Sequence, residues 1–196
     1  MKKIYLILFS ILTFISCEED DSSIIRPLSD FERTIIPFEE EETVEFANEL
    51  LEIITANVTA KDFGTSYAHR TRDGQVFELE YVTNIFTFES SEEEFMVQIS
   101  RAYSADYTEF SISLNTMDDT IGVIGIQGCE YIGSQDLELE LMDTTVNGFG
   151  YTNVYKFEPC DHDEINLVIV QIIYSIENGI EFIEYEDGTY LRQITE

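Results

Sequence analysis

The chain has 196 residues, with 10 Lys or Arg against 40 Asp or Glu, and its formal net charge is −30. This charge repels nucleic acid phosphates and anionic lipid head groups, which leaves cationic proteins, cations or neutral ligands as partners. A content of 44% hydrophobic and 13% aromatic residues excludes a disordered chain, and the length suits one domain with a single core.

A short apolar run opens the chain and ends at Cys17. Two lysines precede the apolar-rich residues from Ile4 to Ile15, a length typical of the h-region of a signal peptide and too short to span a bilayer. Ser16 then leads directly into Cys17, where a secretory leader would show a small-x-small cleavage site. The pattern predicts a signal peptide over residues 1–16, and its removal leaves eight basic and 40 acidic residues, a net charge of −32.

The junction of Ser16 and Cys17 resembles the lipobox of bacterial lipoproteins, with Phe14 at the position where Leu is most common. The resemblance implies that the Cys17 sulfur receives a diacylglycerol and that Cys17 becomes the first residue of the mature chain. Several acyl chains on one cysteine exceed the single-chain threshold for stable attachment to a membrane. The alternatives are an ordinary leader with a chance cysteine and an uncleaved anchor.

Four acidic residues, Glu18 to Asp21, follow the cysteine. They resemble the export signal that surface-displayed lipoproteins of the Bacteroidetes type carry behind the lipidated cysteine, which implies a lipid-anchored protein on the outer-membrane surface. The alternative is a solvated, charge-extended tether on a protein at the periplasmic face. In both cases residues 17–30, which lack a periodic apolar pattern, are expected to form an acidic tether before a domain over residues 31–196.

Apolar and polar residues alternate along much of the domain, which predicts strands with one buried and one wet face. The alternating segments are Val76–Tyr81, Phe95–Tyr103, Phe110–Leu114 and Leu137–Leu141. The segment Leu167–Ile176 differs because it is apolar on both faces. This is typical of a central strand or of a buried helical segment, and its β-branched residues favour the strand.

The segment Thr43–Ala60 has two interpretations. Apolar residues at 46, 50, 53 and 54 would share one face of a helix, whereas Ile54 to Ala60 alternates as in a strand. We expect two strands here, Thr43–Phe46 and Ile53–Ala60.

Four dipeptides mark tight turns, because Asn-Gly and Asp-Gly supply the positive φ angles that hairpins need. They are Asp73-Gly74, Asn147-Gly148, Asn178-Gly179 and Asp187-Gly188. The last two predict a meander of three strands, Leu167–Ile176, Ile180–Tyr185 and Thr189–Ile194. The expected fold is all-β with at most minor α content, arranged as an antiparallel meander, sandwich or half-barrel in one domain.

Both ends of the domain resemble a broad group of uncharacterised Bacteroidetes-type lipoproteins. The N-terminal end carries Ile36-Pro37-Phe38 and then Thr43 to Asn48, and the C-terminal end carries Tyr174-Ser175, Gly179 to Phe182 and Asp187 to Tyr190. The resemblance implies an antiparallel β domain. It brings no catalytic residues with it.

Two cysteines, Cys129 and Cys160, remain once Cys17 is lipidated. An even pair in an oxidising compartment predicts one disulfide. The alternative is two buried free thiols.

A candidate cation site follows Cys160 in the run Asp161-His162-Asp163-Glu164. Closely spaced carboxylates at Asp161, Asp163 and Glu164 suit a hard cation such as Ca²⁺, although the spacing differs from that of an EF-hand loop. The alternative is a solvated acidic loop. No other cofactor is expected.

Two further sites are candidates for modification. Asp119-Thr120-Ile121 and Asp143-Thr144-Thr145 resemble the Asp-Ser/Thr-apolar acceptor for O-glycosylation in exported Bacteroidetes-type proteins. We expect Thr120 and Thr144 to lie on exposed loops between strands.

Catalytic motifs of hydrolases, zinc proteases and nucleotide-binding loops are absent from the sequence. His69 and His162 are the two histidines, and neither lies in a triad context. The favoured function is a lipid-anchored, non-enzymatic module of the cell envelope that binds a cationic protein or small ligand. The alternatives are a half-barrel carrier of lipid or another small ligand, an inhibitor of a cationic enzyme such as lysozyme, and a hydrolase with a carboxylate site.

Overall fold

The computed structural model describes residues 23–70, 72, 74–89, 94–103, 107–115, 120–125, 136–158 and 169–195. Its elements in chain order are β1 (Ile24–Arg26), α2 (Asp30–Thr34), β2 (Glu42–Asn48), β3 (Ile53–Val58), β4 (Asp62–His69), β5 (Val76–Phe88), β6 (Glu94–Arg101), β7 (Thr108–Asn115), β8 (Thr120–Gly125), the 3-10 helix η1 (Leu137–Glu140), β9 (Met142–Val146), β10 (Phe149–Phe157), β11 (Ile169–Ser175), β12 (Gly179–Tyr185) and β13 (Tyr190–Gln193).

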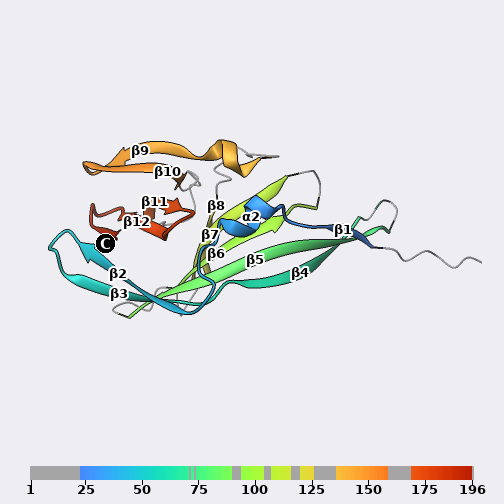
Figure 1. Cartoon of the computed structure of the whole chain (residues 1–196), viewed down its shortest axis with the longest axis horizontal. Coiled ribbons are helices and arrows are strands. Elements are labelled where there is room, and N and C mark those ends of the chain that lie inside the picture. The colour runs from blue at the N-terminus through green and yellow to red at the C-terminus, as the bar shows by residue number, and fades with distance from the viewer. Residues whose placement is uncertain are drawn as a thin grey trace, which may run out of the picture.

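The strands of the described part form one curled sheet, a half-barrel, in a single domain (Figure 1). Their order is β8-β7-β6-β5-β3-β2-β13-β12-β11-β10-β9, and β1 and β4 pair with the first part of β5. All pairs are antiparallel except β1 with β5. The all-β, antiparallel, one-domain prediction is therefore confirmed, as a half-barrel.

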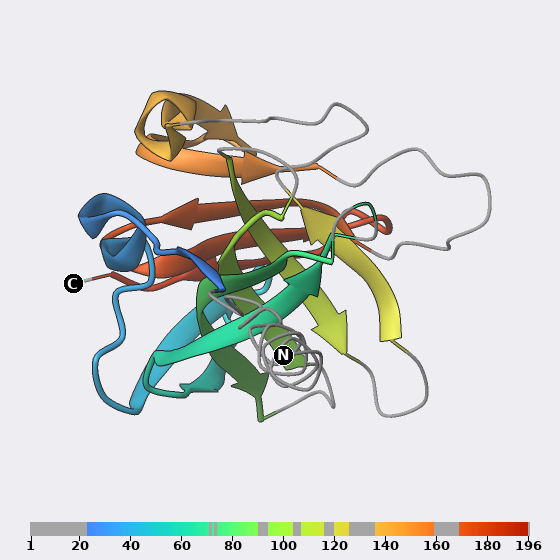
Figure 2. The ribbon, with the colours of Figure 1, turned by 90° about the vertical axis from the view of Figure 1, so that its right-hand side faces the viewer.

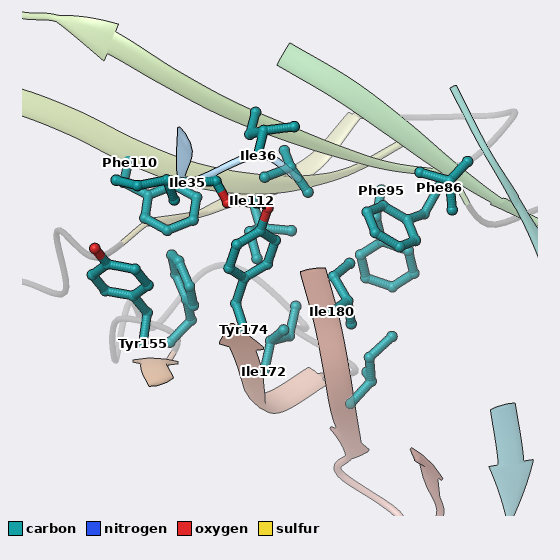
Figure 3. Close-up of a cluster of buried hydrophobic side chains, with 14 of the residues drawn as sticks. Ile35, Ile36, Phe86, Phe95, Phe110, Ile112, Tyr155, Ile172, Tyr174 and Ile180 are labelled. Carbon is teal, nitrogen blue, oxygen red and sulfur yellow. Dashed lines mark hydrogen bonds between the residues drawn. The ribbon is translucent and has the colours of Figure 1, made fainter. Parts of the chain in front are cut away.

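The concave side of the half-barrel is filled by side chains of the protein itself. Ile35 and Ile36, just after α2, are fully buried beside Phe110, Tyr155 and Tyr174 (Figure 3). The Phe110 ring makes edge-to-face contacts with the rings of Tyr155 and Tyr174, each at a centroid distance of 5.1 Å. Such pairs prefer this geometry, and they join β7 to β10 and β11 across the core.

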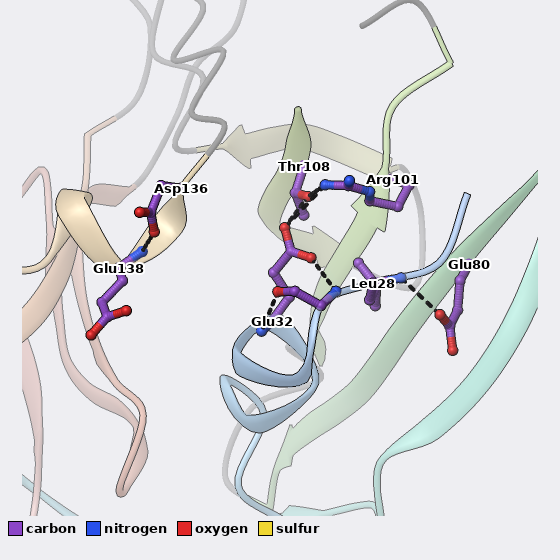
Figure 4. Close-up of polar contacts among 8 residues, drawn as sticks. Leu28, Glu32, Glu80, Arg101, Thr108, Asp136 and Glu138 are labelled. Atoms are coloured by element: carbon purple, nitrogen blue, oxygen red, sulfur yellow. Dashed lines mark hydrogen bonds and ion pairs between the residues drawn. The ribbon is translucent and has the colours of Figure 1, made fainter. Parts of the chain in front are cut away.

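The expected tether is shorter than predicted, because residues 24–30 belong to the domain. β1 pairs in parallel with β5, and Leu28 is buried in the core. Glu80 holds this segment by accepting a hydrogen bond from the Leu28 N–H at 2.7 Å (Figure 4). It accepts a second one from Arg33 Nη2, also at 2.7 Å. Pairing with a strand some fifty residues away leaves no local periodicity, so the sequence pattern does not reveal it.

Two predictions between residues 43 and 141 have opposite outcomes. β2 and β3 confirm the two strands expected in Thr43–Ala60, and the helical alternative is wrong. The strand expected over Leu137–Leu141 is also wrong, since residues 137–140 form η1. Asp136 starts this turn by accepting the Glu138 N–H at 3.1 Å, and an N-terminal Asp of this kind favours a helical turn over a strand.

The predicted hairpins are confirmed at all four turns. Gly74, Gly148, Gly179 and Gly188 have φ angles of +71°, +83°, +76° and +86°, and each follows or joins antiparallel strands. The C-terminal meander is present as β11, β12 and β13. β11 is buried on both faces over residues 172–175, which confirms it as a central strand.

Alkaline pH is expected to destabilise the domain through its buried tyrosines. Burial raises the pKa of Tyr151 to about 12, and it also raises the pKa values of Tyr155 and Tyr174. The folded state therefore keeps these protons more tightly than the unfolded chain, whose tyrosines titrate near their ordinary value of about 10. The contribution of the Tyr151 pKa shift to the free energy of unfolding is complete below about pH 10, and it is lost as pH rises through about 12.

Melting curves from pH 8 to 12, read beside tyrosinate absorbance, check this expectation. The Tyr151 hydroxyl has no hydrogen-bond partner among the described residues, so Tyr151→Phe should fold normally and lose less stability than the wild type above pH 10. Equal alkaline losses in the two proteins would contradict the assignment.

Candidate functional site

Most of the sites predicted from sequence lie outside the described residues. These are the lipidation site Cys17, the cysteines Cys129 and Cys160, and the carboxylates Asp161, Asp163 and Glu164. Lipidation, disulfide and cation site therefore stay predictions. Among the described residues, no group of three or more His, Cys, Asp or Glu side chains is placed to hold a metal ion.

The two predicted glycosylation threonines lie in strands, so the expectation of exposed loops is wrong. Thr120 is the first residue of β8 and pairs with Asn115. Thr144 is half-buried in the middle of β9, where it pairs with Tyr151. Short acceptor motifs do not reveal whether their backbone is paired, because pairing depends on the partner strand. His69, at the end of β4, is exposed and pairs with Val76.

Surface grooves of the described part carry carboxylates that already have structural partners or lie open to solvent. One groove of about 330 Å³ is lined by Glu78 and Glu80 beside β1. Glu80 binds Arg33, and Glu78 accepts a hydrogen bond from the Ser23 hydroxyl. A second groove, of about 430 Å³, contains the exposed Glu41 and Glu42.

The most distinctive exposed feature is the turn between β2 and β3, which we call the β2–β3 tip (residues 48–53). Leu50, Leu51 and Ile53 have 70%, 78% and 56% of their surface exposed. Single exposed apolar residues are common on proteins, but three large aliphatic side chains in one turn form a patch typical of an interaction site.

Asn48 holds the β2–β3 tip in one conformation. Its side-chain oxygen accepts the N–H groups of Leu50 and Glu52, at 3.0 and 2.9 Å, and its side-chain amide donates to the Glu52 carboxylate at 2.8 Å. Leu51 has a φ of +62°, a left-handed conformation that costs a leucine free energy. Strain of this kind at an exposed turn motivates a functional interpretation.

The β2–β3 tip lies at the end of the molecule opposite β1, next to two other hairpin turns (Figure 1). Leu191 of β13 pairs with Asn48, and the Glu49 carboxylate accepts the Tyr190 N–H at 3.5 Å. Exposed carboxylates lie in the β2–β3 tip, at Glu49 and Glu52, and in the neighbouring turn between β12 and β13, at Glu186 and Asp187. Hydrogen bonds from Thr189 hold the pKa of the Asp187 carboxyl below its usual range, so this charge persists under mild acid.

Sequence reasoning missed the β2–β3 tip because two of its apolar residues, Leu50 and Ile53, also fit the apolar face of the alternative helix. The available signal was the adjacent pair Leu50-Leu51 between two acidic residues and two alternating strands. In a turn between strands, such a pair has no core to enter.

Comparisons with known proteins give no match: no family model, curated protein or solved structure is significantly similar to this chain. None of the helices in the described ranges has the length and apolar character needed to cross a membrane.

Relieving the strain of Leu51 is expected to stabilise the protein. Asparagine adopts the left-handed conformation more readily, so Leu51→Asn should raise the free energy of unfolding by about 0.5–1 kcal/mol. Leu50→Asn is the matched control, since Leu50 is equally exposed but has a negative φ. Urea denaturation of both variants measures the difference. If Leu50→Asn gains as much as Leu51→Asn, solubility rather than backbone strain explains the gain.

Proposed function

We propose that this protein is a lipid-anchored, non-enzymatic binding module of the bacterial outer membrane, displayed on the cell surface and attached through Cys17. The observation that carries the proposal is the strained, exposed β2–β3 tip at the end of the domain opposite the N-terminal strand. A module tethered at one end presents its other end to partners in solution.

The partner that fits the β2–β3 tip is a cationic protein with an apolar pocket. The mature chain has eight basic against 40 acidic residues, so its electrostatic potential is negative. The carboxylates in and beside the β2–β3 tip make the potential there more negative. Complementary charge raises the rate of encounter and excludes acidic partners, while the leucines supply apolar contact at the centre of the interface. A tip that is ordered before binding loses less conformational entropy on binding.

An inhibitor of a cationic enzyme is a special case of this function. A protruding, ordered turn is suited to enter an active-site cleft, and lysozyme is a convenient cationic test enzyme. The carrier alternative has less support, because the N-terminal segment around Ile35 and Ile36 occupies the concave side of the sheet.

The anchor is tested by intact-mass analysis of the membrane fraction. A chain that starts at Cys17 and carries a diacylglycerol is expected, and a Cys17→Ala variant should leave the outer membrane. Retention of that variant in the outer membrane would overturn the lipid anchor. Protease shaving of intact cells then distinguishes surface display from the periplasmic face.

The binding end is tested by photo-crosslinking in cells. A photoreactive phenylalanine analogue at Leu50 should give one main protein adduct, whereas the same group at the exposed Thr152 of β10 should not. The purified partner should bind the wild type more weakly as NaCl rises, and Leu51→Asn should weaken binding despite its greater stability. Equal labelling at both positions would contradict a binding site at the β2–β3 tip. Unchanged hydrolysis by lysozyme would exclude the inhibitor version for that enzyme.

A further inference from the structure

Charge is distributed very unevenly along the chain. Residues 23–34, 61–82 and 101–103 together contain six basic and six acidic residues, so their formal charge is zero. From residue 35 onward, the rest of the chain contains 30 acidic residues and two basic ones, Lys156 and Arg192. Almost all of the charge of the mature domain therefore lies outside three short segments.

These segments build one end of the molecule. β1 and β4 pair with the opposite edges of the first part of β5, giving a three-stranded unit that we call the N-terminal ribbon (residues 24–26, 62–69 and 76–81). Figure 2 looks onto this end, where β4 and β5 cross in front of the rest of the sheet. The ribbon itself carries one basic and three acidic side chains, and neighbouring basic residues such as Arg33, Lys61 and Arg70 balance them. This end as a whole is therefore neutral, whereas the rest of the domain is strongly acidic.

One face of the N-terminal ribbon exposes large apolar and aromatic side chains. Ile25 and Tyr67 both pair with Glu78, from either side of β5, and they are 66% and 64% exposed. Phe63, 47% exposed, lines the same groove as Ile25. The same face also carries Glu78, between Ile25 and Tyr67, and Glu80, which binds Arg33. An aliphatic side chain, a phenylalanine and a tyrosine together with charged groups are the composition found where proteins meet the head-group region of a bilayer.

The anchor keeps this face close to the membrane. Cys17 is six residues before Ser23, the first described residue. At full extension six residues span at most about 20 Å. Lipid attached at Cys17 therefore holds the start of the N-terminal ribbon within that distance of the bilayer surface, whereas the β2–β3 tip lies at the other end of the domain.

We propose that the N-terminal ribbon lies on the bilayer, with Ile25, Phe63 and Tyr67 in the interfacial region and the acidic body directed away from the membrane. The inference rests on the proposed lipid anchor at Cys17. Anionic lipid head groups repel the acidic body more strongly than the end that contains the ribbon, where basic neighbours balance the carboxylates, so charge and apolar burial favour the same orientation. The ribbon supplements the lipid anchor and directs the β2–β3 tip outward.

The chain contains no tryptophan, so one introduced tryptophan reports on one position. The full-length lipidated protein would carry Phe63→Trp or Tyr67→Trp on the ribbon, and Leu50→Trp at the β2–β3 tip as the matched control. All three positions are exposed, and circular dichroism checks that each variant folds. Each is reconstituted into vesicles of phosphatidylethanolamine and phosphatidylglycerol, with or without bromine on the upper part of the acyl chains.

In vesicles the emission of both ribbon variants should shift to shorter wavelength. Brominated lipid should quench about half of their emission, because an indole in the interfacial region lies within reach of acyl bromines. The emission of Leu50→Trp should neither shift in wavelength nor be quenched by brominated lipid. Agreement between two ribbon positions protects the result against a local effect of either substitution.

Three results would overturn the inference, and the first two are distinguishable from failure of the proposed lipid anchor. Equal responses of all three variants, in protein whose Cys17 lipid is verified by mass, reject the membrane-bound ribbon alone. A blue shift in detergent that increases with protein concentration assigns the ribbon face to a second copy of the chain. An unmodified Cys17 rejects the anchor, and the inference falls with it.

Discussion

Replacing Gly179 with alanine is expected to lower the free energy of unfolding by about 3 kcal/mol. Gly179 has a φ of +76°, and a Cβ atom there would lie 2.7 Å from Phe38 Cε2 and 2.9 Å from Phe86 Cζ. Both rings are buried and pack edge to face at 5.4 Å. The variant therefore combines an unfavourable backbone conformation with a clash in a part of the core where the rings have little room to move.

Gly188→Ala is the matched control for this experiment. Gly188 also has a positive φ, +86°, but a Cβ there meets no atom within 4 Å. Gly188→Ala should lower the free energy of unfolding by only about 1 kcal/mol, which is the cost of placing alanine in this backbone conformation. Urea denaturation followed by circular dichroism measures both. Equal losses in the two variants would show that the rings of Phe38 and Phe86 yield to the extra methyl group.

Replacing Glu32 with alanine is expected to cost about 3 kcal/mol, because it leaves several buried polar groups without their partner. One Glu32 oxygen accepts the Ser29 N–H at 2.6 Å, in a capping box that starts α2. The other accepts hydrogen bonds from the Thr108 hydroxyl and from Arg101 Nη1, the latter at 3.3 Å (Figure 4). The same carboxylate thus starts the helix and fixes it to β6 and β7.

Two further variants serve as comparisons for Glu32→Ala. Glu32→Gln keeps the size of the side chain and one acceptor oxygen, so its free energy of unfolding should lie between those of the wild type and Glu32→Ala. Asp30→Ala removes an exposed charge from the same helical turn, and about 0.5 kcal/mol is expected from its interaction with the helix end. The measurement is again chemical denaturation. A Glu32→Ala loss no larger than that of Asp30→Ala would mean that Arg101 and Thr108 find other partners.

Local pattern was sufficient to predict most of the sheet. Alternation identified β6, and Asn-Gly and Asp-Gly dipeptides identified the hairpins, because each depends on residues close together in sequence. Long-range contacts were not predictable in this way. β1 pairs with a distant strand, which local pattern does not show. The alternating segment at residues 137–140 forms η1 instead of a strand, with Leu137 buried and Leu139 exposed.

The candidate site was harder to predict than the fold. Leu50 and Leu51 are ordinary core residues by composition, and only the pairing of β2 with β3 places them in an exposed turn. The charge balance at the end that contains the N-terminal ribbon is readable from the sequence only once the segments around Arg26, Arg70 and Arg101 are known to be neighbours. The expectation that Thr144 lies on an exposed loop was wrong because its neighbours in sequence match the acceptor motif but do not show that its backbone pairs in a strand.

The pairing of β2 with β13 has a consequence for folding. β2 is the first long strand of the domain, and its edge pairs with the last strand of the described chain, where the Ile194 N–H also donates to the Glu45 carbonyl at 2.8 Å. During synthesis β2 therefore emerges early, and its edge stays unpaired until the C-terminal residues have been made. Contacts so distant in sequence fold slowly, and unpaired edges invite association between chains. The exposed glutamates Glu42 and Glu45 on this strand repel other copies during that interval.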